Sequence, residues 1–279
     1  MGIPERTVRS NIRVVDSLAI DKEMGLVLDK LPKILPGHRA EWSREYIHRQ
    51  TGLPSLGKQK GNTSMIKNRT AQLIFQSFYC AIGLIGVVAS VGFFEYKFRT
   101  YFFTKFTNLS NYLCVGIMFA ELIQTAKKKQ DSFVTMKPKL KFIGMMAIVL
   151  TFLVYNILLA GEPGRDPAYN FSISSVTLHI ILPLMFVADW FLFYEKKTVK
   201  WTYPLWSTAF PLIYVGFIYI RAWILNFNPD APEIYPYFFL NLGALGLASV
   251  IRWILILLVA FITVGFAFYG IDKVVSKRK

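Results

Sequence analysis

Long apolar segments separated by short polar stretches dominate the sequence after residue 70. Each is close to the roughly 20 residues that a helix needs to cross a hydrocarbon core of about 30 Å. A chain in lipid must satisfy its backbone hydrogen bonds internally, and no series of alternating strands is present, so we expect helices. The pattern predicts an all-α polytopic membrane protein with six transmembrane helices, at residues 71–94, 109–126, 141–160, 173–194, 203–225 and 248–270.

The distribution of charge predicts how these helices are oriented. The net charge of +15 would also suit a nucleic-acid partner, but Lys and Arg concentrate in alternate segments, namely 1–70, 127–141, 195–200 and 271–279. The segment 226–236 holds no Lys or Arg. Because basic loops stay in the cytoplasm, we expect a cell-membrane protein with both termini inside and no nucleic-acid partner.

Residues 1–64 differ in composition from the rest of the chain. They contain a short amphipathic piece at 39–50 and a connector rich in Pro, Gly and Lys at 53–64. We expect a cytoplasmic extension that offers a surface for a cytoplasmic partner, followed by a membrane domain over 65–279. Met65 is an alternative start of the chain, in which case the extension is not part of the protein.

The last apolar region is too long for one perpendicular helix at 1.5 Å per residue. It runs from Tyr235 to Gly270 and contains Pro236, Gly243 and Gly246 near its beginning. These residues predict a break. We therefore interpret YPYFFLNLGALG, residues 235–246, as a re-entrant or interfacial segment that precedes the sixth helix.

Polar residues gather at the predicted outer ends of several helices. With the orientation above, one level of the membrane holds Thr107, Asn108, Asn111, Tyr155, Asn156, Ser175, His179, Arg221 and Arg252. Ionisable groups in a membrane usually face the bundle or a wet cavity. The sequence therefore predicts a polar cavity that opens toward the outer leaflet.

Two neighbours of His179 shape its predicted surroundings. Ser175 lies four residues earlier on the same helix face, and Pro183, four residues later, leaves a carbonyl without its usual donor and bends the helix. On the cytoplasmic half, Glu121 and Asp189 lie near helix ends, where we expect them to reach water or lysines.

Structural explanations exist for each candidate residue. Thr107 or Asn108 could serve as the N-cap of its helix. His179 could be a buried hydrogen-bonding partner with a structural role only. The side chains of Arg221 and Arg252 could extend to the lipid headgroups. The sequence also lacks a phosphate-binding loop, HExxH, GxSxG and metal-ligand spacings, so we expect no metal and no cofactor.

Four motifs in order resemble the bacterial six-span Pr-six-Pr family over about residues 66–272. They are FTNLSN at 106–111, LHIILPLMFVADW at 178–190, YPLWSTAFPLIY at 203–214 and YPYFFLNLGALG at 235–246. More distantly, the chain is similar to the androgen-induced-gene family, which includes membrane threonine hydrolases of fatty acid esters. This resemblance implies Thr107 as nucleophile, His179 as base, Asp189 as the following acidic residue and Tyr235–Pro236 as the pair before the last helix. Pro183 lies one residue closer to His179 than the hydrolase pattern places it.

Two functions follow from these expectations. As a hydrolase of lipid or fatty acid esters, the chain would use Thr107 and His179, with Asn108 or Asn111 as oxyanion donors. Arg221, Arg252 and Tyr235 would then bind the remaining polar groups of the substrate. As a non-catalytic protein with a lipid-binding, sensing or scaffold role, which we favour, it would hold membrane lipids or a fatty acid in the same cavity. A carrier is disfavoured because the polar groups do not continue through the midplane.

Overall fold

The computed structural model describes residues 66, 68–96, 98–99, 101–127, 137–164, 166–225 and 234–275. The chain divides into two compact units, Met1–Gly61 and Asn62–Lys279, and the described residues all belong to the second. The predicted cytoplasmic extension 1–64 and the alternative start at Met65 therefore lie outside the described residues.

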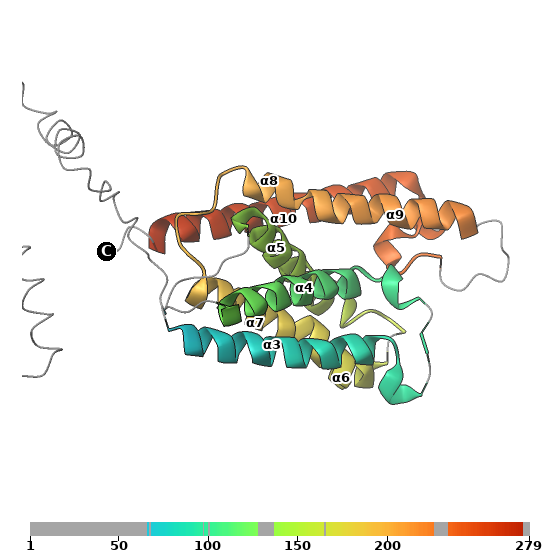
Figure 1. Cartoon of the computed structure of the whole chain (residues 1–279). Helices are drawn as coiled ribbons and strands as arrows, with labels where there is room; N and C mark the ends of the chain where they lie inside the picture. Colours follow the sequence, from blue (N-terminus) through green and yellow to red (C-terminus); the bar gives the residue numbers. More distant parts are fainter. Residues whose placement is uncertain are drawn as a thin grey trace, which may run out of the picture. The chain divides into compact units, whose positions relative to one another are not determined.

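Every element in the described part of the chain is helical (Figure 1). The α-helices are α3 (Arg69–Ser90), α4 (Phe106–Lys127), α5 (Pro138–Val154), α6 (Ile173–Val176), α7 (Leu182–Phe193), α8 (Tyr203–Ser207), α9 (Ala209–Leu225) and α10 (Leu242–Val275). Short 3-10 turns cover Phe93–Glu95, Phe102–Thr104, Pro167–Phe171 and Phe238–Leu240, and π-helical turns cover Tyr155–Leu159 and Thr177–Ile181.

Six helical stretches are long and apolar enough to cross a membrane, which confirms the predicted all-helical class and indicates a multi-pass membrane protein. They are Arg69–Ser90, Phe106–Lys127, Pro138–Leu159, Ile173–Phe193, Tyr203–Leu225 and Leu242–Val275. The predicted segments coincide with them to within a few residues at most boundaries. The sixth stretch begins six residues earlier than predicted.

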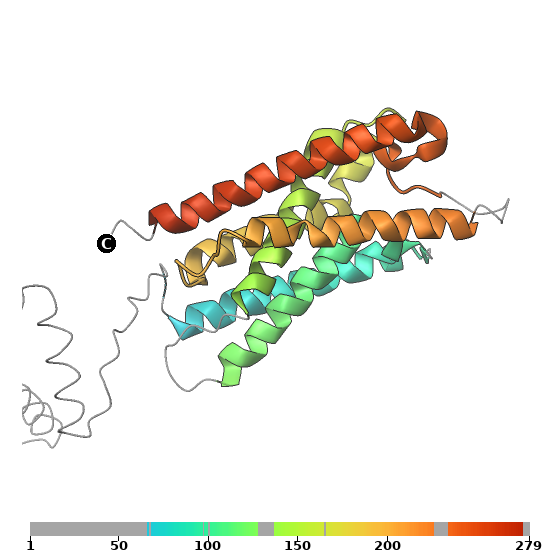
Figure 2. The same ribbon diagram turned by 90° about the horizontal axis from the view of Figure 1, so that it is seen from above.

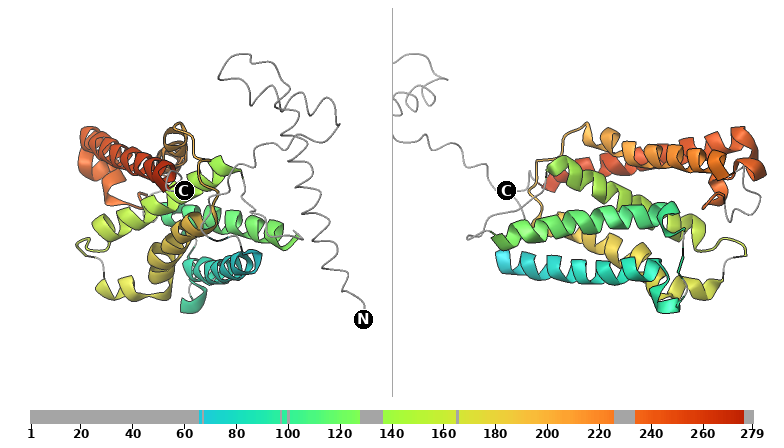
Figure 3. Two further views of the ribbon diagram at one scale, coloured as in Figure 1. Left: turned by 90° about the vertical axis from the view of Figure 1, so that its left-hand side faces the viewer. Right: turned by 45° about the vertical axis from the view of Figure 1, so that its right-hand side comes forward.

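Successive long helices alternate in direction, so the bundle has two ends (Figure 1). We call the end with residues 91–96, 98–99, 101–105, 160–164, 166–172 and 234–241 the distal end, and the end with residues 194–202 and 275 the proximal end. Helix α5 crosses the bundle obliquely and contacts α4, α7 and α8 (Figure 2). Seen along the bundle, α9 and α10 lie on one side and α3 and α4 on the other (Figure 3).

Prolines and a cap explain several helix boundaries. The Asn68 side chain accepts a hydrogen bond from the Ala71 amide at 3.1 Å and caps α3. Pro138 occupies the first turn of α5, where its missing N–H costs nothing. Pro211 cannot donate to the carbonyl of Ser207, which explains why the fifth crossing is interrupted at Thr208 between α8 and α9.

The two π-helical turns interrupt the third and fourth crossings near the distal end. In the first, the Ala160 amide donates to the Tyr155 carbonyl at 2.8 Å, five residues back. In the second, the Leu182 amide donates to the Thr177 carbonyl, again over five residues. Such turns are rare and are frequent at functional sites. They carry Tyr155 and His179, respectively.

Small residues allow the helices to pack closely. A Cβ atom on Gly83 of α3 would lie 2.6 Å from a Val115 methyl group of α4, and one on Gly144 of α5 would lie 2.7 Å from the Ile117 side chain. Close backbone approach at small residues is the usual way in which membrane helices gain packing contacts. The largest buried apolar cluster accordingly joins α3, α4, α5 and α7.

The expected backbone break before the last crossing occurs at Gly246. This residue has φ 73° and ψ 159°, a conformation essentially restricted to glycine, and it separates residues 242–245 from the long straight part of α10. The segment that precedes α10 packs its rings together, with Tyr237 and Phe239 stacked at 5.2 Å between centroids. It forms part of the site described next.

Candidate functional site

A polar cavity of about 450 Å³ lies at the distal end of the bundle. Its walls come from the 98–105 connection, the first turn of α4, both π-helical turns and the segment before α10. Arg99 and Lys105 supply positive charge to the lining, and no acidic side chain belongs to the lining among the described residues. The cavity is therefore suited to a neutral or anionic polar group.

His179 lies in the wall of this cavity, in a defined set of contacts. Its ring stacks on that of Tyr155 with 3.4 Å between centroids and 9° between planes. Its Nδ1 lies 2.9 Å from the carbonyl oxygen of Ser175 and 3.3 Å from the Ser175 hydroxyl. A carbonyl only accepts, so Nδ1 carries the hydrogen, and in the neutral ring the lone pair is on Nε2.

A chain of hydrogen bonds continues from Ser175. The Tyr155 hydroxyl donates to Asn170 Oδ1 at 2.6 Å and lies 2.6 Å from the Ser175 hydroxyl, which must then donate to it. The Asn170 amide donates to the Ala160 carbonyl at 2.9 Å. The carbonyl of His179, left without its helical donor by Pro183, lies 3.4 Å from Asn156 Nδ2. The ring of His179 is therefore fixed from several sides.

Thr107 and Asn108 lie in the first turn of α4 and also line the polar cavity. The Asn108 side chain donates to the carbonyl of Phe102 at 2.6 Å and holds the 98–105 connection. The Thr107 amide donates to the hydroxyl of Tyr237 at 3.5 Å. Burial raises the pKa of Tyr237, and its hydrogen bonds with Thr107 offset part of that rise, so the phenol stays protonated at neutral pH.

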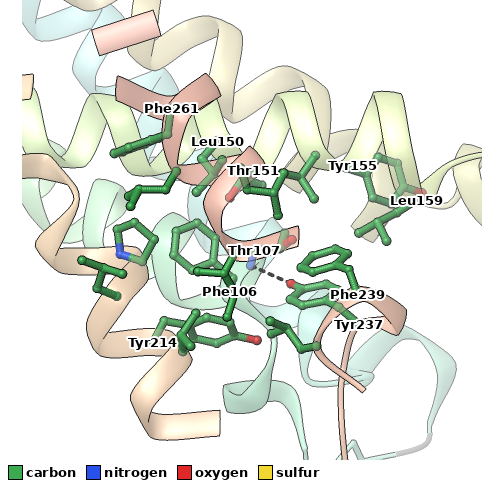
Figure 4. A pocket seen from close by; sticks show the side chains of 18 residues that line it. Phe106, Thr107, Leu150, Thr151, Tyr155, Leu159, Tyr214, Tyr237, Phe239 and Phe261 are labelled. Carbon is green, nitrogen blue, oxygen red and sulfur yellow. Dashed lines mark hydrogen bonds between the residues drawn. The ribbon is translucent and has the colours of Figure 1, made fainter. Parts of the chain in front are cut away.

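A second cavity, of about 80 Å³, is almost purely apolar (Figure 4). Its lining includes Phe106, Leu150, Val215, Phe239 and Phe261 from four helices and the segment before α10. The Tyr214 hydroxyl in its lining donates to the Thr104 carbonyl at 2.7 Å. A further apolar hollow of about 200 Å³ between α5 and α10 shares Leu150 and Leu257 with it.

The polar and the apolar cavity share part of their walls. Thr107, Tyr155, Leu159 and Tyr237 line both. In Figure 4, Thr107 lies beside Tyr237 between the aromatic side chains of the apolar cavity. The site is thus a pair of compartments of opposite polarity that meet at a common partition.

The structure brings some predicted site residues together and not others. Thr107, Asn108 and His179 line one cavity. Asn111 does not line it, because its Nδ2 donates to the carbonyls of Thr107 and Leu178, at 2.8 and 3.0 Å. Asn111 thus ties α4 to the fourth crossing.

The other three predicted binding residues lie outside the cavity wall. Arg221 donates to the Ile234 carbonyl at 2.7 Å and lies 5.4 Å from the ring centroid of Tyr101. Tyr235 packs against Tyr219 at 6.0 Å between centroids, and Arg252 is exposed on α10. The cations that do line the cavity are Arg99 and Lys105, in the connection before α4, and the sequence pattern did not single them out.

A second polar cluster lies buried near the proximal end. Lys141 Nζ is 2.6 Å from Glu121 Oε2 and 2.6 Å from Asp189 Oδ2, and the three side chains are at most 4% exposed. The two carboxylates do reach a lysine, as expected, but they do so inside the bundle. Sequence reasoning missed Lys141 because it belongs to a basic connection that looked like an ordinary cytoplasmic loop.

No family model matches the chain, and no curated protein or solved structure matches it either. Among the described residues, no three His, Cys, Asp or Glu side chains are grouped so as to hold a metal ion. The function is therefore inferred from the geometry of the two compartments.

Proposed function

We propose that the protein binds an amphipathic lipid at the distal end without transforming it. The single observation that carries this proposal is the shared partition of the two cavities. A molecule with a polar head and a hydrocarbon chain needs two adjoining compartments of that kind. The polar group of the lipid would occupy the polar cavity beside Arg99 and Lys105. Its hydrocarbon chain would enter the apolar cavity and the apolar hollow between α5 and α10.

The charge of the lining supports an anionic head. Arg99 and Lys105 are cationic, and Tyr169 and Tyr101 add phenolic donors to the same wall. A phosphate or carboxylate gains charge-assisted hydrogen bonds from such groups. The hydrocarbon chain would gain roughly 0.8 kcal/mol for each methylene that it removes from water.

The experiment is a binding titration with a fluorescent fatty acid and a fluorescent lysophospholipid in detergent micelles. V215W fills the apolar cavity and should weaken the binding of both the fatty acid and the lysophospholipid. I213W, on the exposed side of α9, is the matched control. K105Q should weaken anionic ligands selectively, with K127Q at the opposite end as its control. If V215W and I213W bind the two lipids with equal affinity, the apolar cavity does not hold the hydrocarbon chain.

A second candidate is an ester hydrolase that uses Thr107 and His179. The specific observation in its favour is that Thr107 lies at the partition, where the ester linkage of a bound lipid would lie. The first turn of α4 also provides the positive end of a helix dipole, which would stabilise an oxyanion. His179, with its lone pair on Nε2, has the form of a general base.

In this second candidate, His179 Nε2 takes the proton of the Thr107 hydroxyl as Thr107 Oγ attacks the ester carbonyl. The proton then passes to the departing alcohol, and water hydrolyses the acyl-threonine. A hydroxyl-directed phosphonate probe tests this candidate. It should label the wild-type protein and T107S but not T107A, while T104A, a buried threonine outside both cavities, keeps its label. Labelling of T107A at the wild-type level would reject the nucleophile.

We also propose that the distal end faces outward and that both termini are cytoplasmic in the cell membrane. The asymmetric distribution of basic residues supports this orientation. Single cysteines at Tyr96 and Lys197, in a variant without Cys80 and Cys114, test it with a membrane-impermeant thiol reagent. Labelling of intact cells at position 197 rather than 96 would reverse the assignment.

We propose that residues 235–246 form a re-entrant or interfacial segment at the outer leaflet, supported by the break at Gly246 and the exposed aromatic Phe238. We also propose that the chain belongs to the Pr-six-Pr family, a proposal supported by the four motifs at 106–111, 178–190, 203–214 and 235–246. A quenching measurement with lipid-borne quenchers at different depths would place a Phe238→Trp variant.

A further inference from the structure

The apolar hollow between α5 and α10, of about 200 Å³, lies beside the apolar cavity. The two have four wall residues in common, namely Leu150, Val154, Leu257 and Phe261. The described residues that line the hollow are all aliphatic or aromatic. Two of them on α10, Ile256 and Ala260, are exposed at the surface of the bundle. The hollow therefore lies between the apolar cavity and the surface that faces the membrane.

Helix α10 contains one long uncharged stretch, which Arg252 and Asp272 bound. Residues 253–271 hold no charged side chain and rise about 28 Å at 1.5 Å per residue. This rise matches the thickness of a hydrocarbon core, roughly 30 Å. When the stretch spans the core, Arg252 lies at the distal boundary, at the level of the lipid phosphates, and Asp272 lies at the proximal boundary.

Arg252 also lies directly beside the distal end of the hollow. The next residue, Trp253, and Ile256, four residues later on the same helix face, both line the hollow. Arg252 is exposed, and no hydrogen bond or ion pair within the described part of the chain holds its side chain. A guanidinium at the level of the headgroups binds phosphate or carboxylate through charge-assisted hydrogen bonds. Arg252 is thus placed to bind the head of a lipid whose chain lies in the hollow.

The segment before α10 connects this place with the polar cavity. The ring of Phe238 lies 5.7 Å from the ring of Trp253 between centroids. The two residues before Phe238, Pro236 and Tyr237, line the polar cavity. One short segment therefore borders the hollow on one side and the polar cavity on the other.

We propose that the lipid enters sideways from the membrane leaflet at the distal end, through the hollow, and that Arg252 binds its anionic head at the entrance. This inference rests on the proposed lipid-binding function, in which Arg99 and Lys105 favour an anionic head in the polar cavity. A hydrocarbon chain that moves from the membrane into the hollow exchanges one apolar environment for another, so the hollow adds little affinity. The hollow acts as a passage, and the apolar cavity beyond it holds the chain.

The release of a fluorescent fatty acid from the full-length protein in detergent micelles tests the passage. The loaded protein is mixed with excess unlabelled fatty acid, and the decay of fluorescence anisotropy gives the release rate. A260W narrows the passage, so its release should be severalfold slower than that of the wild-type protein. I256W, at a second exposed position of the wall, should act in the same way. V259W, an exposed neighbour outside the wall, is the matched control and should release at the wild-type rate.

The direction of the change separates a passage from a pocket. A side chain that fills part of a pocket removes contacts of the ligand and speeds its release, as we expect for V215W in the apolar cavity. A side chain that obstructs a passage slows release. Release from A260W and I256W at the rate of V259W, or faster, would overturn the passage, and weaker binding by V215W would still support the apolar cavity. A wild-type protein that binds no fatty acid would overturn both proposals.

Association rates test the role of Arg252. In mildly alkaline buffer, where the fatty acid is ionised, R252Q should slow its association severalfold. R252K keeps the positive charge and should keep most of the rate. A fatty alcohol with the same fluorophore is uncharged and should associate equally fast with R252Q and the wild-type protein. Equal rates of fatty acid association for R252Q and the wild-type protein would overturn the role of Arg252, as would an equal slowing of both ligands.

Discussion

The ring of His179 lies flat against the ring of Tyr155, with 3.4 Å between the centroids and 9° between the planes. Each residue belongs to a π-helical turn of a different crossing. The contact joins the third and fourth crossings at the wall of the polar cavity, and the hydrogen bonds of Ser175 connect the two residues a second time. The position of the histidine therefore depends on the tyrosine as well as on its own helix.

Replacement of Tyr155 should separate stacking from hydrogen bonding. Y155F keeps the ring and loses the bonds to Asn170 and Ser175, so we expect a loss of about 1 kcal/mol in the free energy of unfolding. Y155L also loses the stack, and we expect about 2–4 kcal/mol. Unfolding in mixed micelles with increasing denaturing detergent measures both. Equal losses in the two variants would mean that the stack contributes nothing.

Asn111 should act as a tie between helices rather than as an oxyanion donor. N111L removes the bonds to the carbonyls of Thr107 and Leu178, and we expect a loss of about 1–2 kcal/mol in stability, since membrane hydrogen bonds average about 0.6 kcal/mol each and buried acceptors are left unpaired. T263V, which removes an exposed bond to the Val259 carbonyl, should change stability little. Thermal unfolding of N111L and T263V in detergent compares the two losses. Similar melting curves would show that the hydrogen bonds of Asn111 do not hold the two helices together.

Lys141 should be among the least replaceable side chains. K141M leaves two carboxylates in a buried site without their cation, and we expect a loss of about 3–5 kcal/mol or a failure to accumulate in the membrane. K139M, two residues earlier, loses a contact of 3.5 Å with the Trp206 ring, worth about 0.5–1 kcal/mol. Expression level and thermal unfolding compare them. A K141M protein as stable as K139M would show that the carboxylates do not need the lysine.

Lys196 should make stability depend on pH. Burial lowers its pKa from 10.5 to about 8, with nearby Asp272 and Asp189 opposing that change. Between these two values the unfolded chain holds more protons than the folded chain, so this residue makes the free energy of unfolding rise with pH; below about pH 8 its contribution is constant.

An arginine variant isolates the effect of Lys196 from other titrating groups. K196R stays charged throughout the range and should lack the rise, so the stability difference between wild type and K196R should widen from pH 8 to 10.5. Thermal unfolding in detergent at a series of pH values measures it. The contact of Lys196 with the Trp190 ring, at 3.6 Å, favours the charged form and makes the slope shallower. A difference that is constant with pH would contradict the lowered pKa.

Gly246 should resist substitution although its side chain position is open. No atom lies within 4 Å of a Cβ built there, but its φ of 73° with ψ of 159° strains any other residue. We expect G246A to lose about 1–3 kcal/mol. G216A in the middle of α9, also with open space around it but ordinary helical geometry, should be neutral or stabilising. Thermal unfolding of the two variants makes the comparison.

The crossings could be predicted from the sequence because lipid imposes length and apolarity on each helix independently. The break near Gly246 was also readable, since glycine and proline mark backbone exceptions. The convergence of Thr107, Asn108 and His179 on one cavity followed from helix direction alone. These features depend on local composition and on the alternating direction of successive helices. Both can be read from a single sequence.

The rest depends on helix rotation and on contacts between distant residues. Arg221 and Arg252 were predicted to lie at the level of His179, but neither lines the polar cavity: Arg221 binds the Ile234 carbonyl and Arg252 is exposed on α10. The ion contacts of Lys141 join residues 20 positions and 48 positions apart, from 121 to 141 and from 141 to 189. The end of the bundle at which Thr107, Asn108 and His179 lie could be predicted from helix direction, whereas the contacts that each side chain makes around its helix could not.

The π-helical turns have a consequence for how this site tolerates changes in chain length. Each such turn accommodates one residue more than a regular helix would place over the same rise. Deletion of a single residue there would restore even winding and turn the residues on one side of the deletion by about 100° relative to the other. The crossing would still span the same apolar layer, yet the imidazole and phenol would no longer meet. Shortening by one position would therefore leave a sound membrane helix with a dismantled pocket.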